Sequence, residues 1–487
     1  TVMAGNYEQS MYRQLMEVMS RLDAVEKDLR DEKTEHKDDV DRLNKKIDSL
    51  EQENQLLRDD NARLKSILNN DSSNTSNPPS TDQKSGKPAN TYNGRKKTNR
   101  KAGGQKGHKG TTLTKAMVEE KIKSGKCRHI IQKIGTPNKK PYITKYSIDL
   151  DVVPLITEIR IYADKHGHYA IPPEYHSDVV YGANIKALAT TLYSEGVMSN
   201  DRIAAFLNAA SGDQLELSEG SVYHFCKSLA EKSKDSLVTL EEELLNQKVV
   251  ATDATGVTVN GEQNYIRNFS NEKTVLYCAM QKKTIEAMRS ISFLNRFSGT
   301  LIHDHETALY HFGTAHGECN VHIIRYLRKN TEEAKHKWSS EMISLLCEMN
   351  NTRKALLDRG ETAFCTKEIE SYETKYKELI QYGREENKNT KHKYAKTDEK
   401  KLLNRMEKYM DNHLLFLHDF SVPFDDNMSE RDLRKAKNRE KMAGGFRKTK
   451  GHEMYCAILT IVETLKRRKM GIIENIKLLF AGTPAIF

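Results

Sequence analysis

The chain has few features of an exported or membrane-inserted protein. Seven cysteines are scattered over 487 residues with no CxxC pair among them: Cys127, Cys226, Cys278, Cys319, Cys347, Cys365 and Cys456. A scattered and odd set argues against a disulfide framework and fits a reducing, cytoplasmic compartment. No apolar run reaches transmembrane length and no signal peptide is recognisable, so we expect no membrane partner.

Apolar residues are also scarce, at 37%, whereas charged residues make up 30% of the chain. This balance indicates long solvated helices around modest cores, and the length predicts roughly three domains. Lys and Arg outnumber Asp and Glu by 78 to 68, which leaves a net charge of +10. A surplus of this size fits a polyanionic partner.

Residues 7–70 contain neither Gly nor Pro and carry a heptad pattern. Leucines recur every seven residues, and Val40, Ile47, Asn54, Asn61 and Leu68 fill the second seam position. An unbroken 3,4 spacing is typical of a coiled coil, and seam Asn favours a parallel, in-register dimer. A lone solvated helix is the alternative. The residues expected to make the homodimer contacts are Leu43, Ile47, Leu50, Asn54, Leu57, Asn61 and Leu64.

A Ser/Asn/Pro-rich segment over 71–90 predicts a flexible linker, and a basic stretch follows it. Ten Lys/Arg and no acidic residue lie between Gln83 and Val118. Such an arm gains affinity for DNA by counterion release, although a solubilising tail has the same composition. We expect DNA contacts from Arg95, Lys96, Lys97, Arg100, Lys101, Gln105, Lys106, His108 and Lys109.

Residues 119–182 predict a small module of short strands and loops. Cys127, His129, His166 and His168 suggest the remnant of a zinc ribbon, but zinc ligands usually lie two to four residues apart in each half. The spacing here argues against bound zinc. Residues 183–232 then predict three short helices, with Ser199 or Asn200 and Ser218 as caps. They fit either a helix-turn-helix or a plain helical packing module.

Two aspartates follow apolar strand-like segments further along the chain. Asp253 comes after Val249, Val250 and Ala251, and we place it at the end of that strand. Asp304 ends the segment TLIHD, after a helix expected near Thr284–Phe297. Charges beside a core need a reason, and metal ligation is a common one.

The third acidic residue of interest is Glu430, early in a predicted helix with Asp426 and Asn427 as candidate caps. The helix carries a basic face, on which we expect DNA contacts from Arg431, Arg434, Lys435 and Arg439. A carboxylate at the head of a basic helix suits a metal site beside a phosphate backbone.

These motifs resemble the transposases of the insertion-sequence-66 family over most of the chain. The family's Gly-Gly-Gln-x-Gly-His-x-Gly element is matched by Gly103, Gly104, Gln105, Gly107, His108 and Gly110. Its Asp-x-Thr element is matched by Asp253-Ala254-Thr255, and its Asp-Asn-x-x-Glu-Arg element by Asp426, Asn427, Glu430 and Arg431. Its His-x-x-Cys-x-x-His-x-x-Arg run, expected to support the site, is matched by His316, Cys319, His322 and Arg325.

The chain departs from the family pattern at two places. Ala254 replaces the usual Glu, which leaves the preceding aspartate in place. Most cysteines of the family's zinc ribbon are missing, which puts zinc binding there in doubt. His316, Cys319 and His322 have metal-like spacing, but without a recognisable fourth ligand we favour a packing or positioning role.

The resemblance implies a multidomain α+β protein with a ribonuclease-H-like catalytic domain and a DDE transposase activity. Asp253, Asp304 and Glu430 would be both the catalytic residues and the ligands of two Mg²⁺, which Mn²⁺ could replace. Asp253 would bridge both ions. The expected domains are a coiled coil (1–70), a basic linker (71–118), a zinc-ribbon-like module (119–182), a helix-turn-helix-like module (183–245), a first catalytic part (246–319), a helical insertion (320–420) and a second catalytic part (421–487).

The implied partners are double-stranded DNA, both element ends and target, a second copy of the chain and small accessory proteins of the same element. We expect a cytoplasmic protein that associates with the nucleoid when bound to DNA. A DNA-binding regulator explains residues 1–232 equally well but leaves Asp253, Asp304 and Glu430 without a role. A catalytically inactive descendant of a transposase and a nuclease without strand transfer also fit the sequence.

Overall fold

The computed structural model describes residues 2–68, 70, 113–125, 127–132, 144–148, 150, 152–390 and 392–483. The chain divides into two compact units, each interrupted in sequence. The helical unit comprises Thr1–Thr91 and His322–Asp411, and the sheet unit comprises Tyr92–Val321 and Asn412–Phe487. The expected basic arm, from Arg95 to Lys109, lies outside the described residues.

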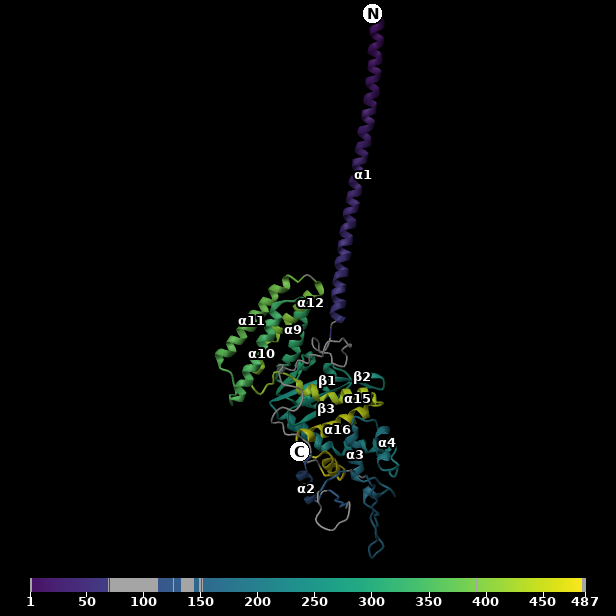
Figure 1. Ribbon diagram of the computed structural model, residues 1–487, viewed down its shortest axis with the longest axis vertical. Coiled ribbons are helices and arrows are strands. Elements are labelled where there is room, and N and C mark those ends of the chain that lie inside the picture. Colours follow the sequence, from purple (N-terminus) through teal and green to yellow (C-terminus); the bar gives the residue numbers. More distant parts are fainter. Residues whose placement is uncertain are drawn as a thin grey trace. The chain divides into compact units, whose positions relative to one another are not determined.

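The helical unit contains long, highly charged helices that share a buried polar cluster. Its helices are α1 (Val2–Leu68), most of α9 (Asn320–Ala334), α10 (Lys337–Asp358), α11 (Thr366–Lys388) and α12 (Lys393–Lys408) (Figure 1). Trp338 is fully buried, and its indole nitrogen donates to Glu399 Oε1 at 2.7 Å. Asn387 Nδ2 donates to Glu399 Oε2 at 2.6 Å. The carboxylate therefore joins α10, α11 and α12 through hydrogen bonds that replace its lost hydration.

The predicted N-terminal helix is present as one continuous element, α1. Its seam leucines are half exposed, for example Leu43 at 56%, Leu50 at 48% and Leu57 at 54%. Apolar side chains at heptad spacing on an isolated helix are left without a core to cover them. The coiled-coil partner remains a prediction.

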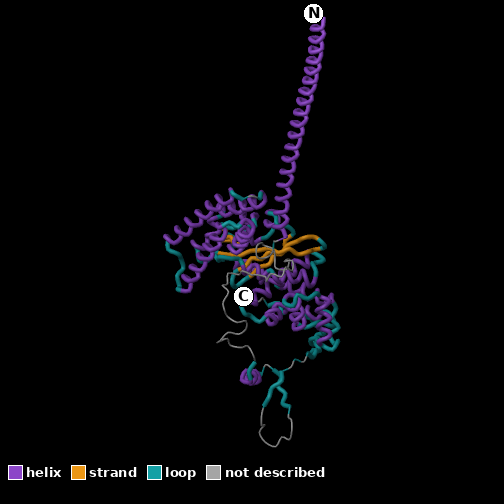
Figure 2. Tube along the Cα trace, turned by 45° about the horizontal axis from the view of Figure 1, so that its top comes forward, coloured by secondary structure: helices purple, strands orange, loops and turns teal. Residues whose placement is uncertain are grey.

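The sheet unit is built on a five-stranded mixed sheet in the order β3-β2-β1-β4-β5. Figure 2 shows the strands in orange, with helices close to them. The strands are β1 (Val249–Val259), β2 (Glu262–Ser270), β3 (Val275–Met280), β4 (Thr300–His303) and β5 (Ala315–Glu318). β1, β2 and β3 form an antiparallel meander, whereas β4 and β5 run parallel to β1. Asn260 and Gly261 form the turn between β1 and β2 with φ of 52° and 81°, the positive values that this two-residue hairpin turn requires. Between β2 and β3, Asn271 N donates to Thr274 O at 3.0 Å.

Helices cover both faces of this sheet, and each face has its own apolar core. On one face, Val257, Val275 and Tyr277 pack with helices that lie far apart in the sequence. These helices are α3 (Ala183–Ser194), α4 (Asn200–Ala210), α5 (Glu219–Lys232), α6 (Lys234–Leu245), α15 (Arg434–Ala443), α16 (Thr449–Arg467) and α17 (Ile472–Phe480). On the other face, Val250 and Phe269 pack against α7 (Ile285–Arg289) and α8 (Ser292–Arg296).

Three short helices occupy residues 183–232, as predicted, and Ser218 caps α5 by accepting from Ser221 N. Ser199 stands at the N-cap position of α4 without a capping hydrogen bond from its side chain. These helices share one core with the sheet and α16, so their apolar faces are buried within the sheet unit. Residues 183–245 therefore pack as part of that unit, whereas the sequence suggests a module of their own.

Other expectations differ from the structure. Residues 119–182 show the end of α2 (Lys115–Lys123) and a 3₁₀ turn, Pro173–Tyr175, but no strand among those described. The single helix expected near 284–297 is two short helices, because Ile291 adopts an extended backbone between them.

The segment expected to be a helical insertion is indeed helical, since it contains α9 to α12 and α13 (Met410–His418). None of the described helices is both long and apolar enough to cross a lipid bilayer.

Candidate active site

The register between β1 and β4 brings the first two aspartates level with each other. Val249, Val250 and Ala251 pair in parallel with Thr300, Leu301 and Ile302. Continuing this register by two residues places Asp304 beside Asp253. The prediction that Asp304 follows a strand is confirmed. The prediction that Asp253 ends its strand is wrong, because β1 continues to Val259 by pairing with β2.

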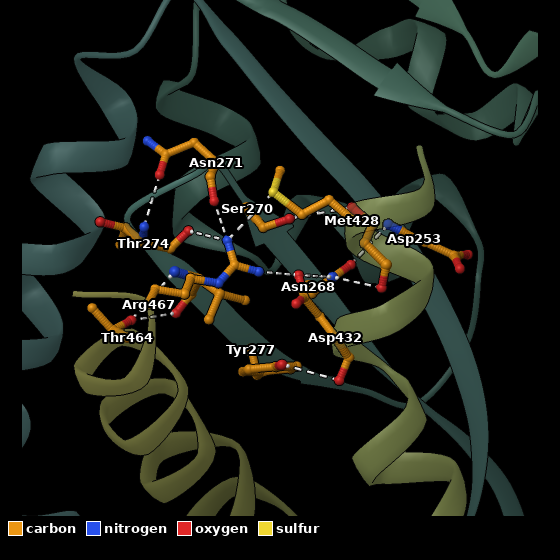
Figure 3. Close-up of polar contacts among 12 residues, drawn as sticks. Asp253, Asn268, Ser270, Asn271, Thr274, Tyr277, Met428, Asp432, Thr464 and Arg467 are labelled. Carbon is orange, nitrogen blue, oxygen red and sulfur yellow. Dashed lines mark hydrogen bonds and ion pairs between the residues drawn. The ribbon is translucent and has the colours of Figure 1, made fainter. Parts of the chain in front are cut away.

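Asn268 of β2 connects Asp253 to the element that carries Glu430. Asp253 N donates to Asn268 Oδ1 at 2.9 Å, and Asn268 Nδ2 donates to Ser429 O at 3.2 Å. Ser429 and Glu430 lie in α14 (Asn427–Asp432). Asn268 is fully buried, so its amide hydrogen bonds hold the short helix against the sheet beside Asp253 (Figure 3).

A buried ion pair provides the second anchor of α14. Arg467 of α16 pairs with Asp432, the last residue of α14, and also donates to Thr274 O at 3.3 Å (Figure 3). Burial raises the pKa of Asp432, and the Arg467 guanidinium opposes that shift. Asp426, a predicted cap, stands at the N-cap position but makes no capping hydrogen bond from its side chain.

The carboxylates at this place repel one another. Burial and the charge of Asp304 raise the pKa of Asp253 to about 6, although Lys437 and Lys283 oppose the shift. Burial and the charges of Asp253, Asp304 and Glu430 raise the pKa of Asp426 well above its ordinary value. Four acidic side chains, from β1, the end of β4 and the start of α14, therefore act on each other electrostatically.

Repulsion of this kind is relieved by a bound cation, and carboxylate oxygens are the donors that Mg²⁺ prefers. Within the described residues, no group of three or more His, Cys, Asp or Glu side chains is arranged so that it could hold a metal ion. Cys127, His129, His166 and His168 are among those residues and form no such group. For the carboxylates, the donor chemistry and the raised pKa values fit a divalent cation, which would require the side chains to adjust.

The predicted supporting residues have separate environments. Cys319 is buried, and its thiol accepts from Asp426 N at 3.2 Å, which links the end of β5 to the start of α14. His316 lies 3.3 Å from His303, between ring nitrogens, and its pKa is lowered by burial. Within the helical unit, His322 Nε2 lies 3.0 Å from Arg325 Nη1.

The basic residues around α15 differ in exposure. Arg431 and Arg434 are exposed, as a contact with a phosphate backbone requires. Lys435 pairs with Glu195 and Glu463. Arg439 is buried at 8% exposure, with its guanidinium 4.2 Å from the ring centre of Tyr193. Its position favours a cation–π contact inside the core over the DNA contact that the basic face predicts.

Sequence reasoning missed Asn268, Asp432 and Arg467 as parts of this site. Their roles depend on contacts between residues that are far apart in the sequence: Asn268 and Asp432 are separated by 164 positions. No local motif marks these residues. It also assigned Asp426 to a helix cap and to the family's Asp-Asn-x-x-Glu-Arg element, but not to the group of acidic site residues. The clustering of Asp426 with Glu430 in one short segment was the available signal for a fourth carboxylate.

The fold and the site together define an α+β protein, as predicted, in which acidic residues of β1, the end of β4 and α14 lie where a mixed sheet meets the basic helix α15. Sequence comparison identifies its family: the model of the transposase IS66 family matches residues 178–454, more than half of the chain. The chain belongs to that family, as the motifs predicted. A comparison with curated proteins returns no match.

Proposed function

We propose that this transposase cuts DNA at the ends of an insertion sequence and joins those ends to target DNA. The observation that carries the proposal is the strand register that places Asp304 beside Asp253, together with the hydrogen bonds of Asn268 that hold α14, and with it Glu430, against the same sheet. Carboxylates placed in this way repel one another, and a bound cation relieves that repulsion. The order β3-β2-β1-β4-β5, with a meander followed by two parallel strands, supports the ribonuclease-H-like fold that the family resemblance implies.

In this proposal Asp253, Asp304 and Glu430 would hold two Mg²⁺ through their carboxylate oxygens. Bound there, the ions would neutralise charge on the scissile phosphate and help to deprotonate the attacking hydroxyl. The hydrogen bonds of Asn268 fix the position of α14 relative to Asp253. The exposed Arg431 and Arg434 bind the phosphate backbone next to the reacting bond.

The reaction has two steps with the same geometry. In the first, a water oxygen attacks the phosphorus at the element end, the bond to the 3′ oxygen breaks, and a 3′-hydroxyl is released. In the second, that hydroxyl attacks a phosphorus of the target and displaces the target's 3′ oxygen. DNA bound to the basic arm, and a second copy of the chain joined through α1, would bring two element ends together.

The test is a Mg²⁺-dependent cleavage and joining assay on the DNA ends that flank the gene. We expect Glu430→Gln to lose at least about 100-fold in both steps, since the metal supplies several kcal/mol of stabilisation to the transition state. DNA binding should be retained. Glu453→Gln, an exposed carboxylate on α16, is the matched control and should keep wild-type rates.

Each other result has a defined meaning. Cleavage without joining in the wild type would identify a nuclease and overturn the strand-transfer step. Equal activity in Glu430→Gln and the wild type would overturn the assignment of the third carboxylate. Tight DNA binding without either step, with accessory proteins supplied, would favour a regulator or an inactive descendant.

A further inference from the structure

The loop that carries Asp304 has an unusual backbone. His305, the next residue, has a φ of 73°, in a left-handed region that only a few per cent of non-glycine residues adopt. Strained backbone of this kind persists only where surrounding contacts hold it in place. Two buried residues, Arg267 and Glu318, contact this loop from neighbouring strands.

Arg267 connects the surroundings of both aspartates. Its side chain is fully buried, and because it pairs with Ala254 it lies on the face of the sheet opposite to Asp253. Its Nη1 donates to Thr252 Oγ1 at 3.0 Å, and its Nη2 contacts Glu306 Oε2 at 2.5 Å. Thr252 precedes Asp253, and Glu306 lies two residues after Asp304. One guanidinium thus links the strand of the first aspartate to the loop of the second.

Glu318 at the end of β5 holds the other side of the loop. It is 2% exposed, and its Oε1 lies 2.8 Å from His305 Nδ1. Tyr310 donates to the same oxygen, and Glu318 Oε2 lies 3.1 Å from His413 Nε2. The strained residue is therefore tied to a buried carboxylate that is itself fixed by two further side chains.

We propose that Arg267 and Glu318 are positioning residues that fix the distance between Asp253 and Asp304 for a divalent cation. The inference rests on the proposed function. A buried guanidinium is costly to desolvate and contributes little net stability. We therefore attribute the contacts of Arg267 with Thr252 and Glu306 to positioning of the Asp304 loop relative to β1, and not to stabilisation of the fold. Residues that orient metal ligands in this way usually change metal affinity by about 10- to 100-fold when replaced.

The experiment measures Mn²⁺ binding to the full-length protein by electron paramagnetic resonance of the free ion. The main variant is Arg267→Met with Glu306→Gln, which removes both charges of the pair and so leaves no unpaired buried ion. We expect its Mn²⁺ affinity to fall about tenfold or more at an unchanged melting temperature. Hydrogen exchange of amides 304–310 should become faster.

Arg267→Lys provides a second, milder test. Its single ammonium keeps the charge beside Glu306 but cannot reproduce the two-armed fork to Thr252. We expect a Mn²⁺ affinity between those of the wild type and the double variant. The matched control is Arg296→Met, which breaks an exposed pair with Glu242 on the same unit and should bind Mn²⁺ like the wild type.

Two results would overturn the proposal in distinguishable ways. If Asp253→Asn loses Mn²⁺ binding while the double variant or Arg267→Lys binds as the wild type does, the metal site stands and the positioning role is wrong. If Asp253→Asn itself binds Mn²⁺ with wild-type affinity, the metal site is not here, and the positioning role falls with it. Glu318→Gln should also accelerate exchange at 304–310, whereas Glu399→Gln, a buried carboxylate of the helical unit, should not.

Discussion

At the scale of single residues, the main feature is the cost of keeping Asp253 ionised beside Asp304. The ordinary pKa of an aspartate is 3.8, and here it is raised to about 6 by burial and by the neighbouring charge. Between these two values the folded protein binds more protons than the unfolded chain does. The contribution of Asp253 to the free energy of unfolding of the metal-free protein therefore falls as the pH rises through this window.

Asp253→Asn should stabilise the metal-free protein at neutral pH. The substitution removes the carboxylate whose ionisation is unfavourable, which is worth at most about 3 kcal/mol for a shift of this size. Calorimetric melting in EDTA should show a higher melting temperature than wild type at about pH 7 and little difference at about pH 4. An equal change at both pH values would show that the repulsion is not its cause.

At the scale of elements, the position of Glu430 depends on how α14 is anchored. The helix has only six residues, too few to be stable alone. Its anchors are the amide of Asn268 and the ion pair between Asp432 and Arg467, with Tyr277 OH donating to Asp432 O at 3.1 Å. The element exists because the sheet and α16 supply its hydrogen-bond partners.

Arg467→Met should therefore destabilise the sheet unit by up to about 3–5 kcal/mol, because it leaves Asp432, whose side chain is 10% exposed, without its cation. Adding Asp432→Asn should recover a large part of that loss, which a double-mutant cycle of unfolding free energies would measure. Arg296→Met, which breaks an exposed pair, should change little. Equal stability of the single and double variants would show that the buried charge is not the source of the cost.

The elements and the acidic residues were largely predictable because their signals are local. Heptad spacing predicted α1, and the apolar segment before Asp304 predicted β4. The length of β1 was not predictable, because residues after Asp253 stay in the strand through their pairing with β2. The buried positions of Arg267 and Arg439 were equally hidden, since sequence gives no sign of which basic residues a core will enclose.

At the scale of the whole molecule, the chain forms two units, and α1 presents an apolar stripe to solvent. The apolar side chains at the seam positions of a single helix stay exposed to water. A second helix of the same sequence, paired in register, would bury them. The exposed seam thus supports a homodimer through α1.

Leu57→Asp should abolish that dimer, and Leu56→Asp should not. The two leucines are adjacent and both exposed, Leu57 at 54% and Leu56 at 68%, but only Leu57 belongs to the heptad seam. A charge in the seam cannot be desolvated on pairing, whereas a charge beside it stays in water. Light scattering coupled to size-exclusion chromatography would measure the mass. Loss of the dimer in both variants, or in neither, would contradict the predicted register.

The chain leaves the sheet unit at the start of α9 and returns in α13, and these two points are bound to each other. Asn320 Nδ2 donates to His413 O at 2.9 Å, and Asn320 N donates to Phe424 O at 3.1 Å. The segment His322–Asp411 therefore begins and ends at one closed junction. We therefore expect that insertions, deletions or the exchange of that whole segment for another domain would leave the path from β5 to α14 intact and the carboxylates in their places.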